Sequence, residues 1–173
     1  MSDHINIRYA TEADAALIAG LSRRTFYDTF AAQNTVENME KFMNEQFTHE
    51  RLAAEVGAPS NVFIIAEVGD KVAGYARMRE VSNPSADELP SIEIARIYAV
   101  QGMIGKGIGN ALMKKCVDIA YEMGKRVIWL GVWEKNERAI QFYIRWGFEK
   151  FGEHDFVLGE DIQRDWLMRK TIG

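Results

Sequence analysis

The sequence has little of several features that define large classes of protein. Its 173 residues include a single cysteine, Cys116, so no disulfide can form within the chain, and we expect a buried structural thiol. The three histidines, His4, His49 and His154, are scattered, with no cysteine or acidic cluster at ligand spacing, which predicts that there is no metal site. No apolar run approaches the length of a membrane span, and the N-terminal segment MSDHINIRYA lacks the apolar core of a signal peptide. We therefore expect a cytoplasmic protein with no membrane association.

An excess of positive charge is absent as well. The chain has 21 lysines and arginines against 25 aspartates and glutamates, and its net charge of −4 argues against nucleic acid as a partner. The same charge is compatible with a cationic substrate. There are no internal repeats or low-complexity tracts, and the length fits one domain over residues 1–173. A domain of this size buries about 70% of its extended-chain surface, so it needs no disulfide or metal for stability.

The hydrophobic pattern predicts a mixed succession of strands and helices. Strands are expected over residues 5–10, 62–68, 72–79, 91–100, 126–133, 148–159 and 163–171. Helices are expected over residues 11–30, 35–57 (with a break near Thr48), 108–123 and 136–146. Gly69-Asp70 predicts a hairpin turn, and the polar segment 81–90, which has two prolines, predicts an exposed loop. This order is that of a mixed sheet flanked by helices.

A glycine-rich segment separates the strand over 91–100 from the helix over 108–123. Residues 104–109 read IGKGIG, so the loop carries little side-chain bulk and its backbone can bend freely. At a helix start, free N–H groups and the positive end of the helix dipole converge, which suits a phosphate group. A tight turn without a ligand is an equally good interpretation of the glycines alone.

Two common phosphate-binding loops are excluded. A Walker loop needs a glycine five residues before Gly105-Lys106 and a serine or threonine after Lys106, and the sequence has neither. The dinucleotide fingerprint G-x-G-x-x-G fails because its third glycine would fall on Asn110.

A second motif, NERAIQFYIRWGF over residues 136–148, changes the interpretation. With the glycine loop, it resembles the GNAT superfamily of acetyl-CoA-dependent N-acetyltransferases. The family's loop, Q/R-x-x-G-x-G/A, corresponds to Ile104–Gly109, and its late helix, N-x-x-A-x-x-F-Y-x-x-x-G-F, corresponds to Asn136–Phe148 residue for residue. Ile104 departs from the pattern, since the family usually has glutamine or arginine there. Backbone amides carry most of the phosphate contact, so we expect weaker but intact cofactor binding.

The resemblance implies an α+β GNAT fold over the whole chain. Such a fold has a central, mostly antiparallel mixed sheet of about seven strands, flanked by about four helices. Its fourth and fifth strands, here the ones that hold Ile97 and Leu130, splay apart, and acetyl-CoA lies in the wedge between them. No metal is involved.

The resemblance also implies the residues that hold acetyl-CoA. The strand segment Ile97, Tyr98 and Ala99 should pair with the pantetheine arm, and a backbone N–H there should stabilise the oxyanion. The loop and first helical turn should bind the pyrophosphate, through Gly105, Lys106, Gly107, Ile108, Gly109 and Asn110. Asn136 should hydrogen-bond the cofactor, with simple helix capping as the competing role.

Direct attack of an amine on the thioester needs no nucleophilic side chain, so the resemblance implies only proton-transfer groups. Tyr143 is expected to act as the general acid towards the leaving thiolate, with a purely structural core aromatic as the alternative. Glu93 is the candidate general base. The alternative is that Glu93 faces solvent or pairs with Arg96.

The acceptor is predicted from local similarity. The segments 93–98, 128–136 and 156–170 are similar to the PaiA-type bacterial polyamine acetyltransferases, which implies spermidine or spermine as the small-molecule amine acceptor. An acidic cluster near the C-terminus could attract a polycation, although it could equally be a solvated turn: Glu153, Asp155, Glu160, Asp161 and Asp165. The alternatives are a protein N-terminal or lysine acetyltransferase and a non-catalytic acetyl-CoA-binding module. Whether the protein forms a homodimer is left open.

Overall fold

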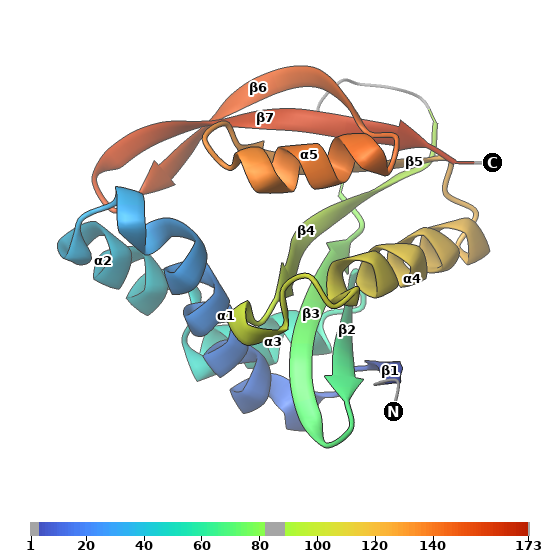
Figure 1. Ribbon diagram of the computed structural model, residues 1–173, viewed down its shortest axis with the longest axis horizontal. Helices are drawn as coiled ribbons and strands as arrows, with labels where there is room; N and C mark the ends of the chain where they lie inside the picture. The colour runs from blue at the N-terminus through green and yellow to red at the C-terminus, as the bar shows by residue number, and fades with distance from the viewer. Residues whose placement is uncertain (1–3, 82–88, 173) are drawn as a thin grey trace.

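The computed structural model describes residues 4–81 and 89–172, so most of the segment predicted as an exposed loop, 81–90, lies outside the described residues. The described chain forms a seven-stranded sheet with the order β1-β2-β3-β4-β5-β7-β6 (Figure 1). The strands are β1 (Ile5–Tyr9), β2 (Asn61–Val68), β3 (Lys71–Arg79), β4 (Ser91–Ala99), β5 (Val127–Trp133), β6 (Glu149–Leu158) and β7 (Asp161–Thr171). The α-helices are α1 (Ala15–Phe30), α2 (Val36–Gln46), α3 (His49–Gly57), α4 (Ile108–Glu122) and α5 (Glu137–Arg145).

The predicted fold class is confirmed. All strand pairs are antiparallel except β4 with β5, so the sheet is mixed in the expected way. Five α-helices stand where about four were expected, because the helical region over 35–57 is divided at Thr48. The Thr48 hydroxyl accepts a hydrogen bond from the Arg51 N–H at 3.1 Å and thereby caps α3. None of the helices in the described ranges is long and apolar enough to cross a membrane.

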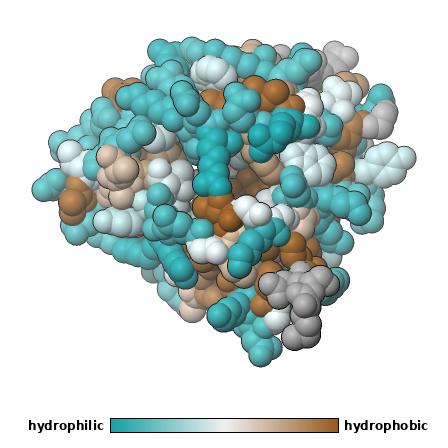
Figure 2. Space-filling view, in the orientation of Figure 1, coloured by the Kyte–Doolittle hydropathy of each residue, from teal (hydrophilic) through white to brown (hydrophobic). Residues whose placement is uncertain are grey.

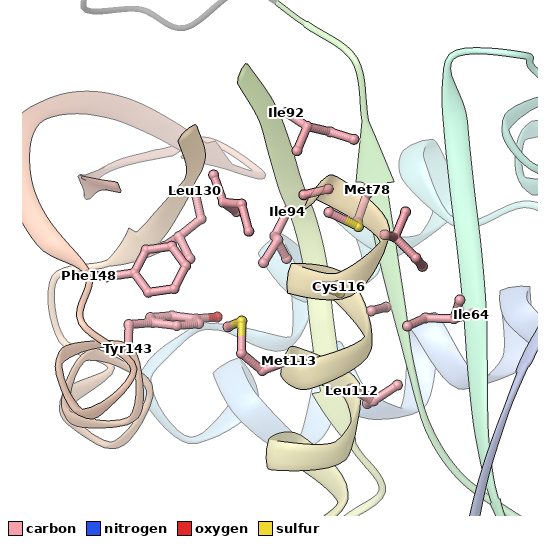
Figure 3. Close-up of a cluster of buried hydrophobic side chains, with 14 of the residues drawn as sticks. Ile64, Met78, Ile92, Ile94, Leu112, Met113, Cys116, Leu130, Tyr143 and Phe148 are labelled. Atoms are coloured by element: carbon pink, nitrogen blue, oxygen red, sulfur yellow. The ribbon is translucent and has the colours of Figure 1, made fainter. Parts of the chain in front are cut away.

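The helices cover the sheet in two layers. On one face, α4 and α5 pack through apolar side chains that include Leu112, Met113 and Tyr143 (Figure 3). On the other face, α1, α2 and α3 enclose a second core with Phe26, Phe47 and Tyr75. Cys116 belongs to the first core and is completely buried, as expected for a structural thiol.

The sheet opens in its middle because β4 bends away from β5. The two strands pair only from Ser91 to Glu93, opposite Val127 to Trp129. Immediately after this, the pairing of β4 with β3 shifts: Met78 lies opposite Ile94, whereas Arg77 lies opposite Arg96, which leaves Ala95 as an extra residue. A bulge of this kind bends and twists its strand. In Figure 1 β4 and β5 accordingly lie together at one end and diverge towards the other.

Candidate active site between β4 and β5

The opening between β4 and β5 holds a cavity of about 850 Å³. One wall is residues 94–99 of β4 and the other is residues 131–133 of β5, while the glycine loop, α5 and α1 close its ends. The face seen in Figure 2 is hollowed near its centre, with apolar side chains at the hollow and hydrophilic ones around it. A volume of this size is in the range of pockets that enclose small molecules and cofactors.

The glycine loop ends this cavity with a group of backbone donors. Gly105 and Gly107 have φ values of +86° and +85°, which a residue with a side chain adopts only with strain. Gly107 is the N-cap of α4, and the first backbone bond of the helix runs from the Ala111 N–H to the Gly107 carbonyl at 3.0 Å. The N–H groups of the preceding turn therefore have no helical carbonyl to bind. The residues that carry them, Ile108, Gly109 and Asn110, line the cavity, and this arrangement fits a phosphate group.

Lys106 is the one member of the predicted loop that lies apart from the cavity. It is not among the residues that line the cavity, and its N–H donates to the Met103 carbonyl at 3.3 Å. Asn110 has a second role, because its Oδ1 accepts a hydrogen bond from Trp146 Nε1 at 3.0 Å. That bond joins the first turn of α4 to the end of α5, so the two helices hold the loop from both sides.

The backbone of β4 presents alternate residues to the opening. The Val100 N–H donates to the Ala73 carbonyl on β3 at 2.7 Å. Backbone groups in a strand point alternately to the two sides, so those of Tyr98 also point to β3, and those of Ile97 and Ala99 point towards β5. Of the three predicted residues, Ile97 and Ala99 can therefore offer N–H and carbonyl groups to a ligand. Tyr98 contributes to the cavity wall.

Tyr143 reaches the cavity from α5. Its ring packs edge-on against Phe142 and Phe148, and the residue is 8% exposed. Figure 3 shows the hydroxyl directed from α5 towards Met113 on α4. Burial, with a smaller contribution from Cys116, raises the pKa of Tyr143 above its ordinary value, so the phenol is neutral at physiological pH and carries a proton.

Asn136 caps α5. Its Oδ1 accepts a hydrogen bond from the Ala139 N–H at 3.3 Å, so the capping role is present. The residue also lines the cavity. Because the cap uses the oxygen, a hydrogen bond to a ligand would come from the Asn136 amide nitrogen, and that second role stays a prediction.

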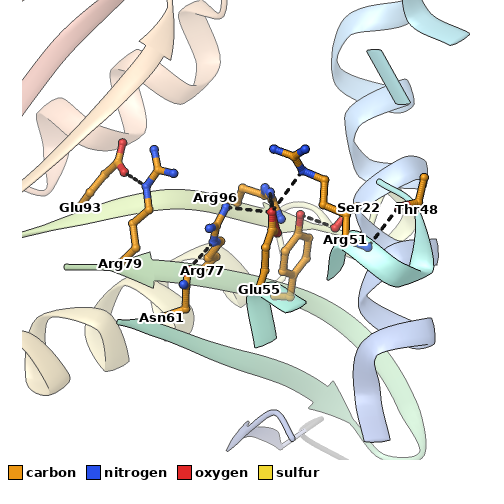
Figure 4. Close-up of polar contacts among 10 residues, drawn as sticks. Ser22, Thr48, Arg51, Glu55, Asn61, Arg77, Arg79, Glu93 and Arg96 are labelled. Atoms are coloured by element: carbon orange, nitrogen blue, oxygen red, sulfur yellow. Dashed lines mark hydrogen bonds and ion pairs between the residues drawn. The ribbon is translucent and has the colours of Figure 1, made fainter. Parts of the chain in front are cut away.

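Glu93 lies outside the cavity, on the paired part of β4. Its carboxylate forms an ion pair with Arg79 on β3 (Figure 4). It does not pair with Arg96, whose guanidinium instead binds Glu55 of α3 at 3.0 Å. Glu93 and Tyr143 are thus not brought together, and the position of Glu93 argues against a role as general base.

The comparison with known sequences agrees with this geometry. The model of the Acetyltransferase (GNAT) family matches residues 23–148, a range that contains the glycine loop and α5. The chain belongs to the GNAT family. This GNAT chain is also 36% identical, over 97% of its length and 98% of the relative's, to an uncharacterized N-acetyltransferase in the pepI 3' region of Lactobacillus delbrueckii subsp. lactis.

Both a sequence match and a structural match of this GNAT chain come from Thermoplasma acidophilum. A spermidine N(1)-acetyltransferase is 24% identical over 89% of this chain and 95% of its own length. The crystal structure of a PaiA N-acetyltransferase in complex with coenzyme A superimposes with a TM-score of 0.82, at 21% identity, over 98% of this chain and 99% of that one. The superposition confirms the GNAT fold.

Several residues on the cavity wall of the GNAT domain escaped the sequence analysis. They are Thr25, Asp28 and Thr29 of α1, Arg96 of β4, and Arg138 and Arg145 of α5. The helix pattern of 11–30 identified only the inward apolar face, and nothing in it indicated that the polar face meets an opening in the sheet. Asp165 of β7 also lines the cavity, and His154 lies beside it.

Burial should make Cys116 of the GNAT domain unreactive. Burial raises its pKa to about 12, so the native thiol stays protonated where an exposed thiol of pKa about 8.5 ionises. We expect no alkylation by iodoacetamide between about pH 7 and pH 9 in the native protein, and complete alkylation in denaturant. The same pKa difference makes stability depend on pH. Above about pH 8.5 the thiol of the unfolded chain loses its proton, whereas the thiol of the folded chain keeps it. The free energy of unfolding therefore falls as the pH rises towards 12. Rapid alkylation of the native protein at pH 8 would contradict this description.

Proposed function

We propose that this protein transfers an acetyl group from acetyl-CoA to a primary amine of a polyamine such as spermidine or spermine. The observation that carries the proposal is the cavity itself, whose wall includes both the first turn of α4 and carboxylates from α1 and β7. A single opening thus offers groups for an anionic cofactor and groups for a cationic acceptor.

The residues of the cavity fit acetyl-CoA, which supplies the activated acetyl thioester. The first turn of α4 would hold the pyrophosphate through N–H groups. The inward-pointing backbone groups of Ile97 and Ala99 would pair with the amides of the pantetheine arm, as an added strand pairs with a sheet edge. This placement fixes the thioester beside β4, where one of the same N–H groups can stabilise negative charge on the carbonyl oxygen.

Tyr143 is proposed as the proton donor to the departing sulfur. Its phenol is held neutral and lies on the cavity wall, so it can supply a proton without first collecting one from solvent. Orientation of the two reactants in one enclosed space supplies a further part of the barrier reduction. Glu93 has no part in this proposal, because Arg79 engages its carboxylate away from the cavity.

Only some of the acidic residues in the C-terminal hairpin are available to attract a polyamine acceptor. Lys150 binds Glu153 at 2.7 Å, and Arg164 lies 3.6 Å from Glu153 and 4.0 Å from Asp155, so these two carboxylates already have cationic partners. Asp165 of the hairpin lines the cavity, as Asp28 of α1 does. These last two carboxylates are the groups we propose for attraction of the cationic acceptor.

Thiol release from acetyl-CoA, measured across a panel of amines, tests the proposal. We expect saturable turnover with spermidine and spermine and little with a lysine peptide or with amino acids. Asp28→Asn should raise KM for spermidine about tenfold and leave KM for acetyl-CoA unchanged, because the lost negative charge attracts a cationic acceptor and not an anionic cofactor. Asp118→Asn, an exposed change of the same kind on α4, is the matched control. Turnover with the lysine peptide alone would favour a protein acceptor, and cofactor binding without turnover would favour a non-catalytic module.

A further inference from the structure

Asp165, which we propose to attract the acceptor, forms a pair with His154 beside the cavity, and the proposed chemistry gives this pair no role in proton transfer. The two residues lie directly opposite each other on β7 and β6, and His154 Nε2 is 3.4 Å from Asp165 Oδ2. The Asp165 side chain is 15% exposed and lines the cavity, whereas the His154 side chain is 48% exposed. One member of the pair thus lies on the cavity wall and the other is in contact with solvent.

Gly131 of β5 makes room for this pair. A Cβ atom at Gly131 would lie 3.3 Å from Asp165 Oδ2 and 3.5 Å from His154 Nε2. The Asp165 carboxylate and the His154 imidazole thus lie close to the backbone of β5 at Gly131. This part of β5 no longer pairs with β4. An acceptor amine that approaches the acetyl site along β5 would pass the carboxylate.

Asp165 lines the same cavity as Tyr98 of β4 and Tyr143 of α5. Burial raises the pKa of Tyr98 on β4, and Tyr75, Tyr143 and Asp165 raise it further. Burial also raises the pKa of Asp165 above its ordinary value, an effect that His154 opposes. A carboxylate with a raised pKa accepts a proton more readily near neutrality.

We propose that Asp165 takes the proton from the acceptor ammonium and that His154 passes this proton to water. This inference rests on the proposed function. A primary ammonium has a pKa of about 10.4, so almost all of the acceptor arrives charged and cannot attack. Its nitrogen gives one proton to Asp165, Asp165 gives it to His154 Nε2, and the exposed imidazolium releases a proton to solvent.

The remaining protons and electrons then balance without another reagent. The neutral amine uses its lone pair to form the C–N bond, and the C–S bond breaks with its electron pair on sulfur. Tyr143 protonates the sulfur and regains a proton from the nitrogen that has become the amide. The products are the acetylated amine, the free thiol and one proton in solution.

Other charged and titratable groups share the cavity with Asp165. They are Asp28 from α1, Arg96 and Tyr98 from β4, and Arg138, Tyr143 and Arg145 from α5, with His154 from β6 at the outer side. Among the cavity-lining carboxylates of the described residues, Asp165 is the one with an imidazole at 3.4 Å, so it is the one with a route for the proton to solvent.

The test compares acceptors that differ in amine pKa. For Asp165→Asn we expect kcat/KM at pH 7 to fall about 10²-fold with spermidine, and far less with a small amine whose pKa lies below the assay pH. Activity with spermidine should also recover as the pH rises, because the free amine becomes abundant. His154→Ala should lose activity with spermidine and regain it when imidazole is added. Asp155→Asn is the matched control, since it removes the same charge from a side chain that is 65% exposed on the same hairpin.

Three outcomes would overturn the proposal. The first is an Asp165→Asn variant that behaves like Asp155→Asn. The second is an equal loss with both classes of amine at every pH, which would mean that Asp165 only binds or positions the acceptor. The third is a His154→Ala variant with full activity. A wild-type protein that acetylates no amine would contradict the proposed function, and with it this inference. Full wild-type turnover together with an unaffected Asp165→Asn variant would contradict only the proton transfer through Asp165 and His154.

Discussion

Replacement of Tyr143 by phenylalanine should lower kcat about 10²-fold while the dissociation constant for acetyl-CoA changes little. The substitution removes only the hydroxyl, so the edge-on contacts of the ring with Phe142 and Phe148 remain. The lost group is the proposed proton donor, and loss of a general acid typically costs about 10²–10⁴-fold in rate. Steady-state thiol release and calorimetric titration with acetyl-CoA measure the two quantities separately.

Tyr98→Phe is the matched control for this prediction. Tyr98 is a second cavity phenol whose pKa is raised by burial, but it lies on β4 rather than on α5. We expect a much smaller loss of kcat for Tyr98→Phe than for Tyr143→Phe. Equal losses in the two variants, or unchanged turnover in Tyr143→Phe, would remove Tyr143 from the role of acid.

Gly107→Val should raise the dissociation constant for acetyl-CoA by at least about tenfold, because it changes the residue that sets the first turn of α4. Gly107 adopts a φ of +85°, which strains a β-branched residue at a cost of about 1–3 kcal/mol. Relief of this strain would rotate the N–H groups of Ile108 and Gly109 away from the cavity. Titration with acetyl-CoA and thermal unfolding of the same samples give the two effects.

The control for Gly107→Val separates strain from loss of the phosphate site. Gly69, in the turn between β2 and β3, has a φ of +60° and open space around its missing Cβ, and it does not line the cavity. Gly69→Val should therefore lower the melting temperature to a similar extent and leave acetyl-CoA affinity unchanged. A Gly107→Val variant that folds and binds acetyl-CoA normally would show that the pyrophosphate is held elsewhere.

Local sequence signals were sufficient for the elements and for the glycine loop that lines the cavity. Thr48 and Asn136 are recognisable caps because their side chains act on N–H groups three residues away. Gly69-Asp70 is recognisable as a turn for a similar reason, and the structure has β2 and β3 on either side of it. Each of these features depends on residues that are neighbours in the chain.

Contacts between distant segments could not be predicted in the same way. Arg96 binds Glu55, which lies 41 residues away on α3, and Glu93 binds Arg79, which the register of β3 with β4 places opposite it. The pairing of His154 with Asp165 depends on the register of the last hairpin. The sequence suggests a turn around residues 159–161, and a shift of one residue there would put either side chain on the opposite face.

The divergence of β4 from β5 gives this sheet more borders than its strand order implies. An unbroken sheet has free edges only at its outer strands, here β1 and β6. Beyond Glu93 the two central strands part, so the peptide groups of Ile97 and Ala99 face an opening where a neighbouring strand would normally stand. The middle of the sheet therefore has unpaired backbone amides, as an edge strand has, and we expect these amides to exchange their hydrogens with deuterated solvent. On the proposed function, the amide groups of a bound ligand would pair with these peptide groups, and the protein would reach its full set of backbone hydrogen bonds only while it holds its substrate.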